Sequence, residues 1–145
     1  MIRYTTTARI DAPPGAVWRV LTDVEAMPTW TRTMDRVTIL SPPGSLGVAG
    51  LVQIDQPKMP RAIWEIDRWE PGAGFSWTTR HRGVRTRADH IIVPAPDGGC
   101  HVRFEVAQSG PMARLVWALT GHRTREYVDL ELAGLATTCR SSPLT

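Results

Sequence analysis

The chain has 145 residues, of which 42% are apolar and 21% charged, and its formal net charge is +3 at pH 7. This length and composition predict a single soluble domain spanning residues 1–145, whose core buries roughly two-thirds of the surface of the unfolded chain. The basic residues are all Arg except Lys58 and are spread along the chain, so no basic tail favours nucleic acid as a partner.

Motifs for export, metal binding and nucleotide binding are missing from the sequence. No segment approaches the roughly 20 apolar residues of a membrane span, and residues 1–14 lack the apolar run of a signal peptide. We therefore expect a cytoplasmic protein in which Cys100 and Cys139 are free thiols. The four histidines lack metal-ligand spacing, and no P-loop, dinucleotide glycine fingerprint or nucleophile elbow occurs, so we expect neither metal nor cofactor.

The first part of the chain predicts one strand followed by two short helices. Residues 2–10 are rich in Thr and Ile, which favour a strand. The Asp-Ala-Pro-Pro-Gly segment at 11–15 ends that strand, and proline suits the first turn of a helix. Val17 and Leu21 give this helix an apolar face, and a second short helix or turn covers about 24–30.

The middle of the chain predicts short strands separated by turns. Val37 and Ile39 alternate with polar residues before a Ser-Pro-Pro-Gly turn at 41–44. Further strands are predicted at 48–54, 62–69, 75–81, 84–93 and 101–107. A two-residue turn at Arg82-Gly83 joins two of them into a hairpin. Because no helix separates the later strands, an antiparallel meander of about seven strands is expected.

The C-terminal segment predicts a long helix at about 111–139, in which Gly121 is expected to loosen or kink the chain. Neighbouring positions on one side of this helix are occupied by Arg123, Glu126, Tyr127 and Leu130. The predicted fold class is α+β, with a curved antiparallel sheet around this helix.

The element order and the sequence at 11–23, DAPPGAVWRVLTD, resemble the START-like (SRPBCC) superfamily. Trp30 at the end of the second short helix adds to the resemblance, and the polyketide cyclase/dehydrase-like branch is the most similar. The resemblance implies a helix-grip fold with a deep cavity. Members bind lipids, sterols, polyketides or plant hormones, only some catalyse a reaction, and no catalytic motif is universal, so the resemblance implies the fold better than the function.

Side-chain alternation assigns the two faces of the predicted hairpin. Phe75, Trp77, Thr79 and His81 share one face with Val84, Thr86, Ala88 and His90. The opposite face carries Arg80, Arg82, Arg85 and Arg87 and is expected to be solvated. Acidic residues of the flanking strands, Glu65, Asp67 and Glu105, can relieve the repulsion among these arginines.

The inner face is therefore the candidate site, because apolar walls with a few polar groups are typical of a ligand pocket. The predicted ligand-binding residues on the strands and the last helix are Trp64, Phe75, Trp77, Thr79, Thr86, His90 and Tyr127. The family resemblance implies that Trp30 lies at the mouth of the cavity, and Met59, on the loop before the Trp64 strand, is expected to gate entry with it. For each tryptophan the alternative is a role in the core. His90 is open to three interpretations: a general base, a hydrogen-bonding group for a ligand, or a structural histidine bonded to a backbone carbonyl.

Three functions compete. The first is binding of a hydrophobic or aromatic small molecule, lipid- or polyketide-like, by a monomer or homodimer. The second is a polyketide aromatase/cyclase or dehydratase in which His90, Tyr127 and Thr86 direct enolisation and loss of water. The third is a protein-interaction module whose cavity matters little. Two or three polar groups in the pocket would suit binding, whereas an ordered acid/base pair would favour catalysis.

Overall fold

A computed structural model describes residues 1–41 and 46–141. Within these residues, seven antiparallel strands form one sheet in the order β1-β7-β6-β5-β4-β3-β2. The strands are β1 (Ile2–Ile10), β2 (Arg36–Ile39), β3 (Leu51–Asp55), β4 (Ala62–Glu70), β5 (Gly74–His81), β6 (Val84–Pro94) and β7 (Cys100–Ser109). The α+β class and the strand number predicted from the sequence are confirmed.

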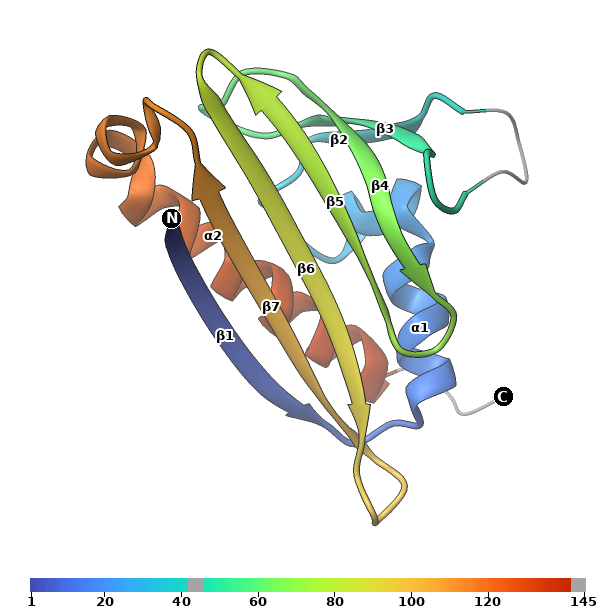
Figure 1. The fold of residues 1–145 in the computed structure, drawn as a ribbon. Helices are drawn as coiled ribbons and strands as arrows, with labels where there is room; N and C mark the ends of the chain where they lie inside the picture. The colour runs from blue at the N-terminus through green and yellow to red at the C-terminus, as the bar shows by residue number, and fades with distance from the viewer. Residues whose placement is uncertain (42–45, 142–145) are drawn as a thin grey trace.

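In the part of the chain that the structure describes, three helices accompany the sheet: α1 (Pro14–Thr22), the 3₁₀ helix η1 (Val24–Thr29) and α2 (Ala113–Ser141). Figure 1 shows α2 crossing behind the curved sheet, on its concave side. Helix α1 lies behind the turn that joins β4 to β5. Helix α2 contacts β1, β7, β6 and α1. The long helix therefore closes the concave face, as the sequence predicts. None of the helices in residues 1–41 and 46–141 is long and apolar enough to cross a membrane.

The β5–β6 hairpin has the predicted register. Its turn is Arg82-Gly83, and both residues have positive φ, 46° and 80°, as a type I′ turn requires. Trp77 pairs with Ala88, and Thr79 pairs with Thr86. The predicted inner and outer faces of both strands follow directly from this pairing.

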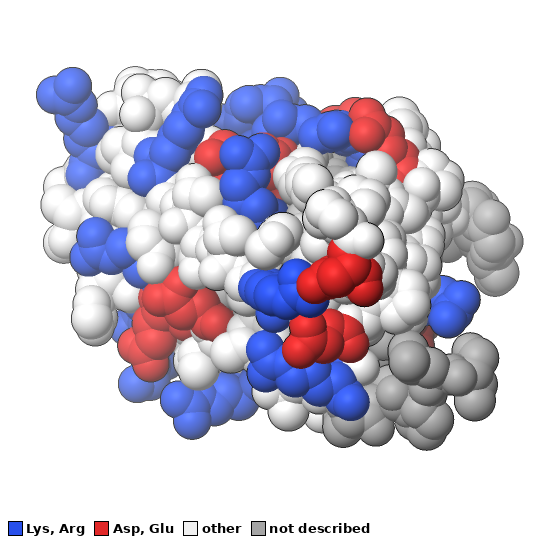
Figure 2. Space-filling view, turned by 90° about the horizontal axis from the view of Figure 1, so that it is seen from below, with Lys and Arg blue, Asp and Glu red and all other residues white. Residues whose placement is uncertain are grey.

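Arg85 and Arg87 of this hairpin lie on the outer face, whereas the exposed Arg80, next to the turn, also borders the space between the sheet and α2. Asp67 on β4 is the shared acidic partner of the first two, 3.3 Å from Arg87 and 4.0 Å from Arg85. Asp89 lies 3.4 Å from Arg87. Basic and acidic side chains are also interspersed on the face of the molecule shown in Figure 2, rather than sorted by sign.

Two local features differ from the sequence-based expectation. The strand predicted to begin at residue 48 begins at Leu51, because residues 47–50 form a turn in which Gly50 N–H donates to the Gly47 carbonyl and Ala49 has φ 72°. Helix α2 runs through Gly121 without a break, and the Trp117 ring packs over that glycine. The turn predicted at 41–44 lies, apart from residue 41, outside the described residues.

One end of the concave face is filled by aromatic rings. The Trp18 ring on α1 lies 5.0 Å from Trp69 and 6.5 Å from Phe75, measured between ring centroids. Edge-to-face and tilted contacts of this kind add about 0.5–1.5 kcal/mol to the burial of each ring. Because α1 covers this end of the sheet, the core is packed here, and the space toward the other end is left for the site.

Candidate ligand-binding cavity

A cavity of about 570 Å³ lies between the concave face of the sheet and α2. This volume is within the range of sites for small organic molecules, about 300–1,000 Å³. Alternate residues of the strands reach it, for example Thr86, Ala88 and His90 on β6. On α2 the lining residues recur every three or four positions, which is one side of a helix: Val116, Thr120, Arg123, Thr124, Tyr127, Val128 and Glu131.

The apolar wall centres on Trp64 and Trp77. Their ring centroids lie 5.9 Å apart, and Trp77 is only 2% exposed. Ala88 pairs with Trp77 on one side and with Val106 on the other. Because the methyl group of Ala88 is smaller than the side chains on both sides of it, it leaves space in front of the concave face of the sheet. This space belongs to the cavity.

His90 lies where the aromatic cluster meets the cavity. Its ring stacks on Phe75 at 4.3 Å between centroids, and Phe104 approaches it edge-on at 4.9 Å. Its Nδ1 lies 3.2 Å from the Phe75 carbonyl oxygen. Because a carbonyl only accepts, Nδ1 carries the hydrogen and Nε2 is left as an acceptor. Burial lowers the pKa of His90 to about 4, so the imidazole is neutral at pH 7.

Glu131 is the acidic group at the other side of the cavity. Its Oε1 accepts hydrogen bonds from the Thr33 hydroxyl at 3.0 Å and from Gln56 Nε2 at 3.5 Å. Thr33 gives its only hydroxyl hydrogen to Glu131, so it accepts from the Thr31 hydroxyl, 2.9 Å away. The two buried threonines thus form a chain of donors that ends on the carboxyl group.

Burial raises the pKa of Glu131 to about 7, opposed by the hydrogen bond from Thr33. Both protonation states are therefore populated near neutral pH.

Three residues of α2, spaced by four, bind three consecutive residues after β3. Glu131 accepts from Gln56, the Tyr127 hydroxyl donates to the Pro57 carbonyl, and Arg123 Nη1 donates to the Lys58 carbonyl at 3.1 Å. These bonds fasten loop 56–61 to the helix along one edge of the cavity. The hydroxyl group of Tyr127 therefore binds the loop, while its ring lines the cavity.

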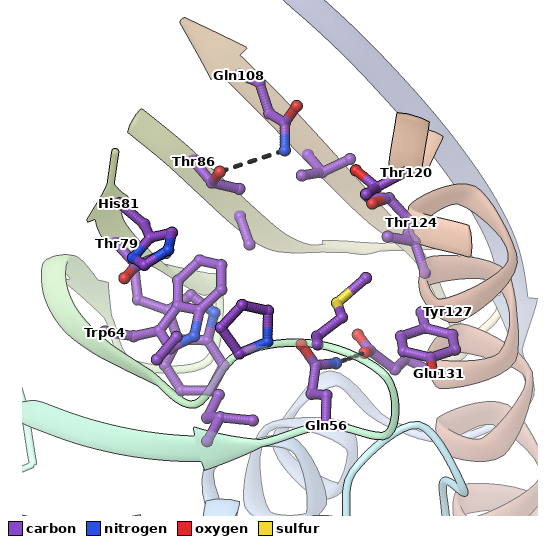
Figure 3. A pocket seen from close by; sticks show the side chains of 18 of the residues that line it. Gln56, Trp64, Thr79, His81, Thr86, Gln108, Thr120, Thr124, Tyr127 and Glu131 are labelled. Atoms are coloured by element: carbon purple, nitrogen blue, oxygen red, sulfur yellow. Dashed lines mark hydrogen bonds between the residues drawn. The ribbon is translucent and has the colours of Figure 1, made fainter. Parts of the chain in front are cut away.

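A second polar group lies apart from Glu131. Gln108 Nε2 donates to the Thr86 hydroxyl at 3.3 Å, and Gln108 Oε1 is buried without a hydrogen-bond partner among the described residues. Figure 3 shows this pair and the Gln56–Glu131 pair on opposite sides of the pocket, with Trp64, Thr79 and His81 between them on a third side. Polar groups therefore flank an apolar middle.

The exposed lining residues mark the mouth of the cavity, and the charged ones among them are basic: Lys58, Arg61 and Arg80. Arg61 is paired with Asp55 at 2.7 Å, whereas Lys58 and Arg80 have no carboxylate partner among the described residues. Across residues 1–41 and 46–141 no group of His, Cys, Asp and Glu is arranged to hold a metal. Cys100 and Cys139 are buried and unbridged.

Most of the residues predicted from the sequence meet at this cavity. Seven of the nine line it: Met59, Trp64, Trp77, Thr79, Thr86, His90 and Tyr127. Phe75 is fully buried behind His90. Trp30 packs against α2, and a Cβ atom on Gly134 would lie only 2.2 Å from the Trp30 carbonyl oxygen. Neither belongs to the described lining. Whether any of these residues contacts a ligand stays a prediction.

Among the lining residues that the sequence reasoning missed are the polar side chains of Glu131, Gln56 and Gln108. Glu131 lies four positions beyond Tyr127, so extending the face of that helix by one turn would have included it. Gln108 continues the inward alternation of Phe104 and Val106. Gln56 lies in a loop, where no periodic signal exists.

With a curved seven-stranded sheet closed by a long C-terminal helix over an internal cavity, the protein has a START-like helix-grip fold. The chain belongs to the polyketide cyclase / dehydrase and lipid transport family, whose model matches residues 1–140. The resemblance seen in the sequence is thus confirmed for family and fold.

Solved structures of other proteins share this fold. TTHA0849 from Thermus thermophilus superposes with a TM-score of 0.75 at 17% identity, covering 97% of this chain and 100% of that one. MLL2253 from Mesorhizobium loti has a TM-score of 0.72 at 19% identity, covering 97% and 99%. Ara h 8.0201 has a TM-score of 0.68 at 12% identity, also covering 97% and 99%. No curated protein sequence matches the chain. At these identities the likeness establishes the fold alone.

Proposed function

We propose that this protein binds an apolar small molecule, lipid-like or polyketide-like, inside the cavity between the sheet and α2. The observation that carries the proposal is the cavity of about 570 Å³ with a tryptophan wall and a lining surface that is mainly apolar. A packed core leaves few voids larger than a water molecule, so a space of this size calls for an occupant. The family, which includes lipid transport and polyketide chemistry, supports the same class of ligand.

The tryptophan wall is expected to supply most of the affinity. Removing apolar surface from water contributes about 25 cal/mol per Å², before the costs of ordering the ligand are subtracted. Truncating Trp77 to Ala should therefore weaken binding of an apolar aromatic probe more than tenfold, or about 1.4 kcal/mol. His90→Ala should cost less, because a neutral hydrogen bond contributes about 0.5–1.5 kcal/mol net.

Titration calorimetry with a naphthalene-based probe tests the proposal. The test variants are Trp64→Ala and Trp77→Ala, and the control is Trp69→Phe, which changes a tryptophan of the same sheet outside the described lining. Each variant is first shown to be folded by its thermal transition. Weaker binding in both wall variants with unchanged binding in the control supports the proposal. No binding to the unmodified protein, or equal loss in all three variants, would refute it.

A second candidate is the cyclase or dehydratase reaction, favoured by two groups that line the same cavity. Glu131 has a pKa raised to about 7 and can give or take a proton at neutral pH, and His90 is neutral. The test is turnover of a polyketide-like substrate. If His90→Ala or Glu131→Gln leaves binding intact and abolishes turnover, the protein is an enzyme and the carrier proposal is replaced.

A further inference from the structure

One oxygen of the Glu131 carboxyl group accepts hydrogen bonds from the described residues, and the other accepts none from them. Both hydrogen bonds from protein side chains, those of Thr33 and Gln56, end on Oε1. No described residue donates to Oε2. Glu131 lines the cavity, and the donor chain that ends on Oε1 holds the carboxyl group in one orientation.

No cation of the described residues balances this carboxyl group. The ion pairs of the structure involve other acids, and the nearest α2 cation along the lining face, Arg123, donates to the Lys58 carbonyl instead. Two other acids border the cavity, but their side chains are bound on the opposite face of the sheet: Asp89 to Arg87, and Glu105 to Thr5. A partly buried carboxylate that lacks a cation is stabilised by additional hydrogen-bond donors.

The donor that completes the site must come from the ligand, and a hydroxyl suits it better than an ammonium group. An ammonium ion would have to pass a mouth that carries Lys58 and Arg80 without carboxylate partners. It would also lose its hydration among apolar walls, which costs far more than burying an alcohol. An alcohol or phenol brings one donor and no charge.

Resting on the proposed function, we infer that the ligand is an apolar molecule carrying a hydroxyl group, and that this hydroxyl donates to Glu131 Oε2 while the apolar body lies against Trp64 and Trp77. Glu131 is then the residue that selects hydroxylated ligands over hydrocarbons and ethers of the same shape. The Thr31–Thr33 chain and Gln56 act as positioning groups for it.

Three matched probes test the inference by calorimetry at pH 8: 2-(2-naphthyl)ethanol, its methyl ether, which accepts but cannot donate, and the corresponding primary amine. Hydrogen bonds to charged groups are roughly twice as strong as neutral ones, so the alcohol should bind at least about tenfold more tightly than the ether. In Glu131→Gln this preference should disappear, because the amide oxygen replaces Oε1 opposite Thr33 and the amide NH₂ then donates to both probes.

Glu126→Gln is the matched control, since it removes the same charge from an exposed position of α2. It should keep the preference for the alcohol. Retained binding of the ether by Glu131→Gln shows that this variant is folded.

The outcomes separate this inference from the function it rests on. If alcohol and ether bind the unmodified protein equally and Glu131→Gln changes neither, the hydroxyl inference is wrong while cavity binding stands. If the amine binds more tightly than the alcohol and loses that advantage in Glu131→Gln, the ligand is cationic and the inference is overturned. If none of the probes binds, the proposed function itself fails.

Discussion

The two ends of the concave face use the same kinds of residue for different purposes. At one end, Trp18, Trp69 and Phe75 pack ring against ring under α1. At the other, Trp64 and Trp77 face a cavity. Phe75 and Trp77 are two residues apart on β5, share a face, and have ring centroids only 5.0 Å apart. The difference lies in what covers them.

This contrast shows that an inward aromatic residue does not by itself indicate a ligand site. Helix α1 brings Trp18 down onto the sheet and fills the space there, whereas the middle of α2 presents Thr120, Thr124 and Val128 and leaves room. Core and cavity are therefore distinguished by the covering helix. The following predictions test whether the packed end carries stability and the hollow end carries binding.

The largest expected effect is on stability at the packed end. Phe75→Ala removes a fully buried ring that contacts four aromatic side chains, and it should cost about 3–5 kcal/mol in the free energy of unfolding. Trp64→Ala, at the cavity wall, should cost clearly less, because one side of that ring already faces a void. Chemical denaturation measures both. Equal losses would contradict the division of the sheet into two functional ends.

The next effect concerns His90, at the boundary between the two ends. Its pKa is about 4 in the folded protein against 6.5 for an unperturbed histidine, so the unfolded chain binds more protons between these values. Stability should therefore fall as the pH drops from 6.5 to 4, by up to about 3 kcal/mol for a difference of about 2.5 pKa units. The free energy of unfolding, measured by denaturation at several pH values between 4.5 and 7, should depend less on pH in His90→Gln than in the unmodified protein. An unchanged pH profile would show that His90 is not buried as described.

The titration of Glu131 should change the free energy of unfolding with pH in the direction opposite to that of His90. Its pKa of about 7 exceeds the unperturbed value of 4.5, so the folded state binds more protons between these values and stability is lost as the pH rises through this window. Relative to the unmodified protein, Glu131→Gln should become progressively more stable from pH 4.5 to 7. A constant difference across this range would argue against a carboxyl group that titrates near neutrality in the cavity.

The smallest effect concerns the loop that borders the cavity. Tyr127→Phe keeps the ring and removes the hydrogen bond to the Pro57 carbonyl, at a cost of about 0.5–1.5 kcal/mol. Amide hydrogen exchange in residues 56–61 should become faster. The control is Tyr4→Phe, because Tyr4 donates to Asp129 away from this loop. If both variants leave the loop equally protected, Tyr127 does not hold it.

Periodic features of the molecule could be predicted from the sequence. The hairpin faces follow from a two-residue alternation and from a turn, Arg82-Gly83, that accepts positive φ at both positions. The extent of α2 follows from its apolar spacing. These are local rules, so no knowledge of the surroundings is needed.

The contents of the site depended on contacts that such rules do not describe. Phe75 was predicted as a ligand residue because it faces inward, but its neighbour Trp18 comes from a helix whose position is set by tertiary packing. Gln56 and Thr33 meet Glu131 only because two irregular segments fold onto α2. The partner of Arg123 is the carbonyl of Lys58, which no helical spacing indicates.

The central claim is that the space between the sheet and α2 is a binding site, and filling that space tests it most directly. Ala88 lies between Trp77 and Val106 and faces the cavity, so Ala88→Phe places a ring where the ligand would lie. Calorimetric titration with the naphthyl ether should show one site on the unmodified protein and at least tenfold weaker binding to Ala88→Phe, with the thermal transition retained. Unchanged affinity in a folded Ala88→Phe variant would contradict the account, because the probe would then bind elsewhere.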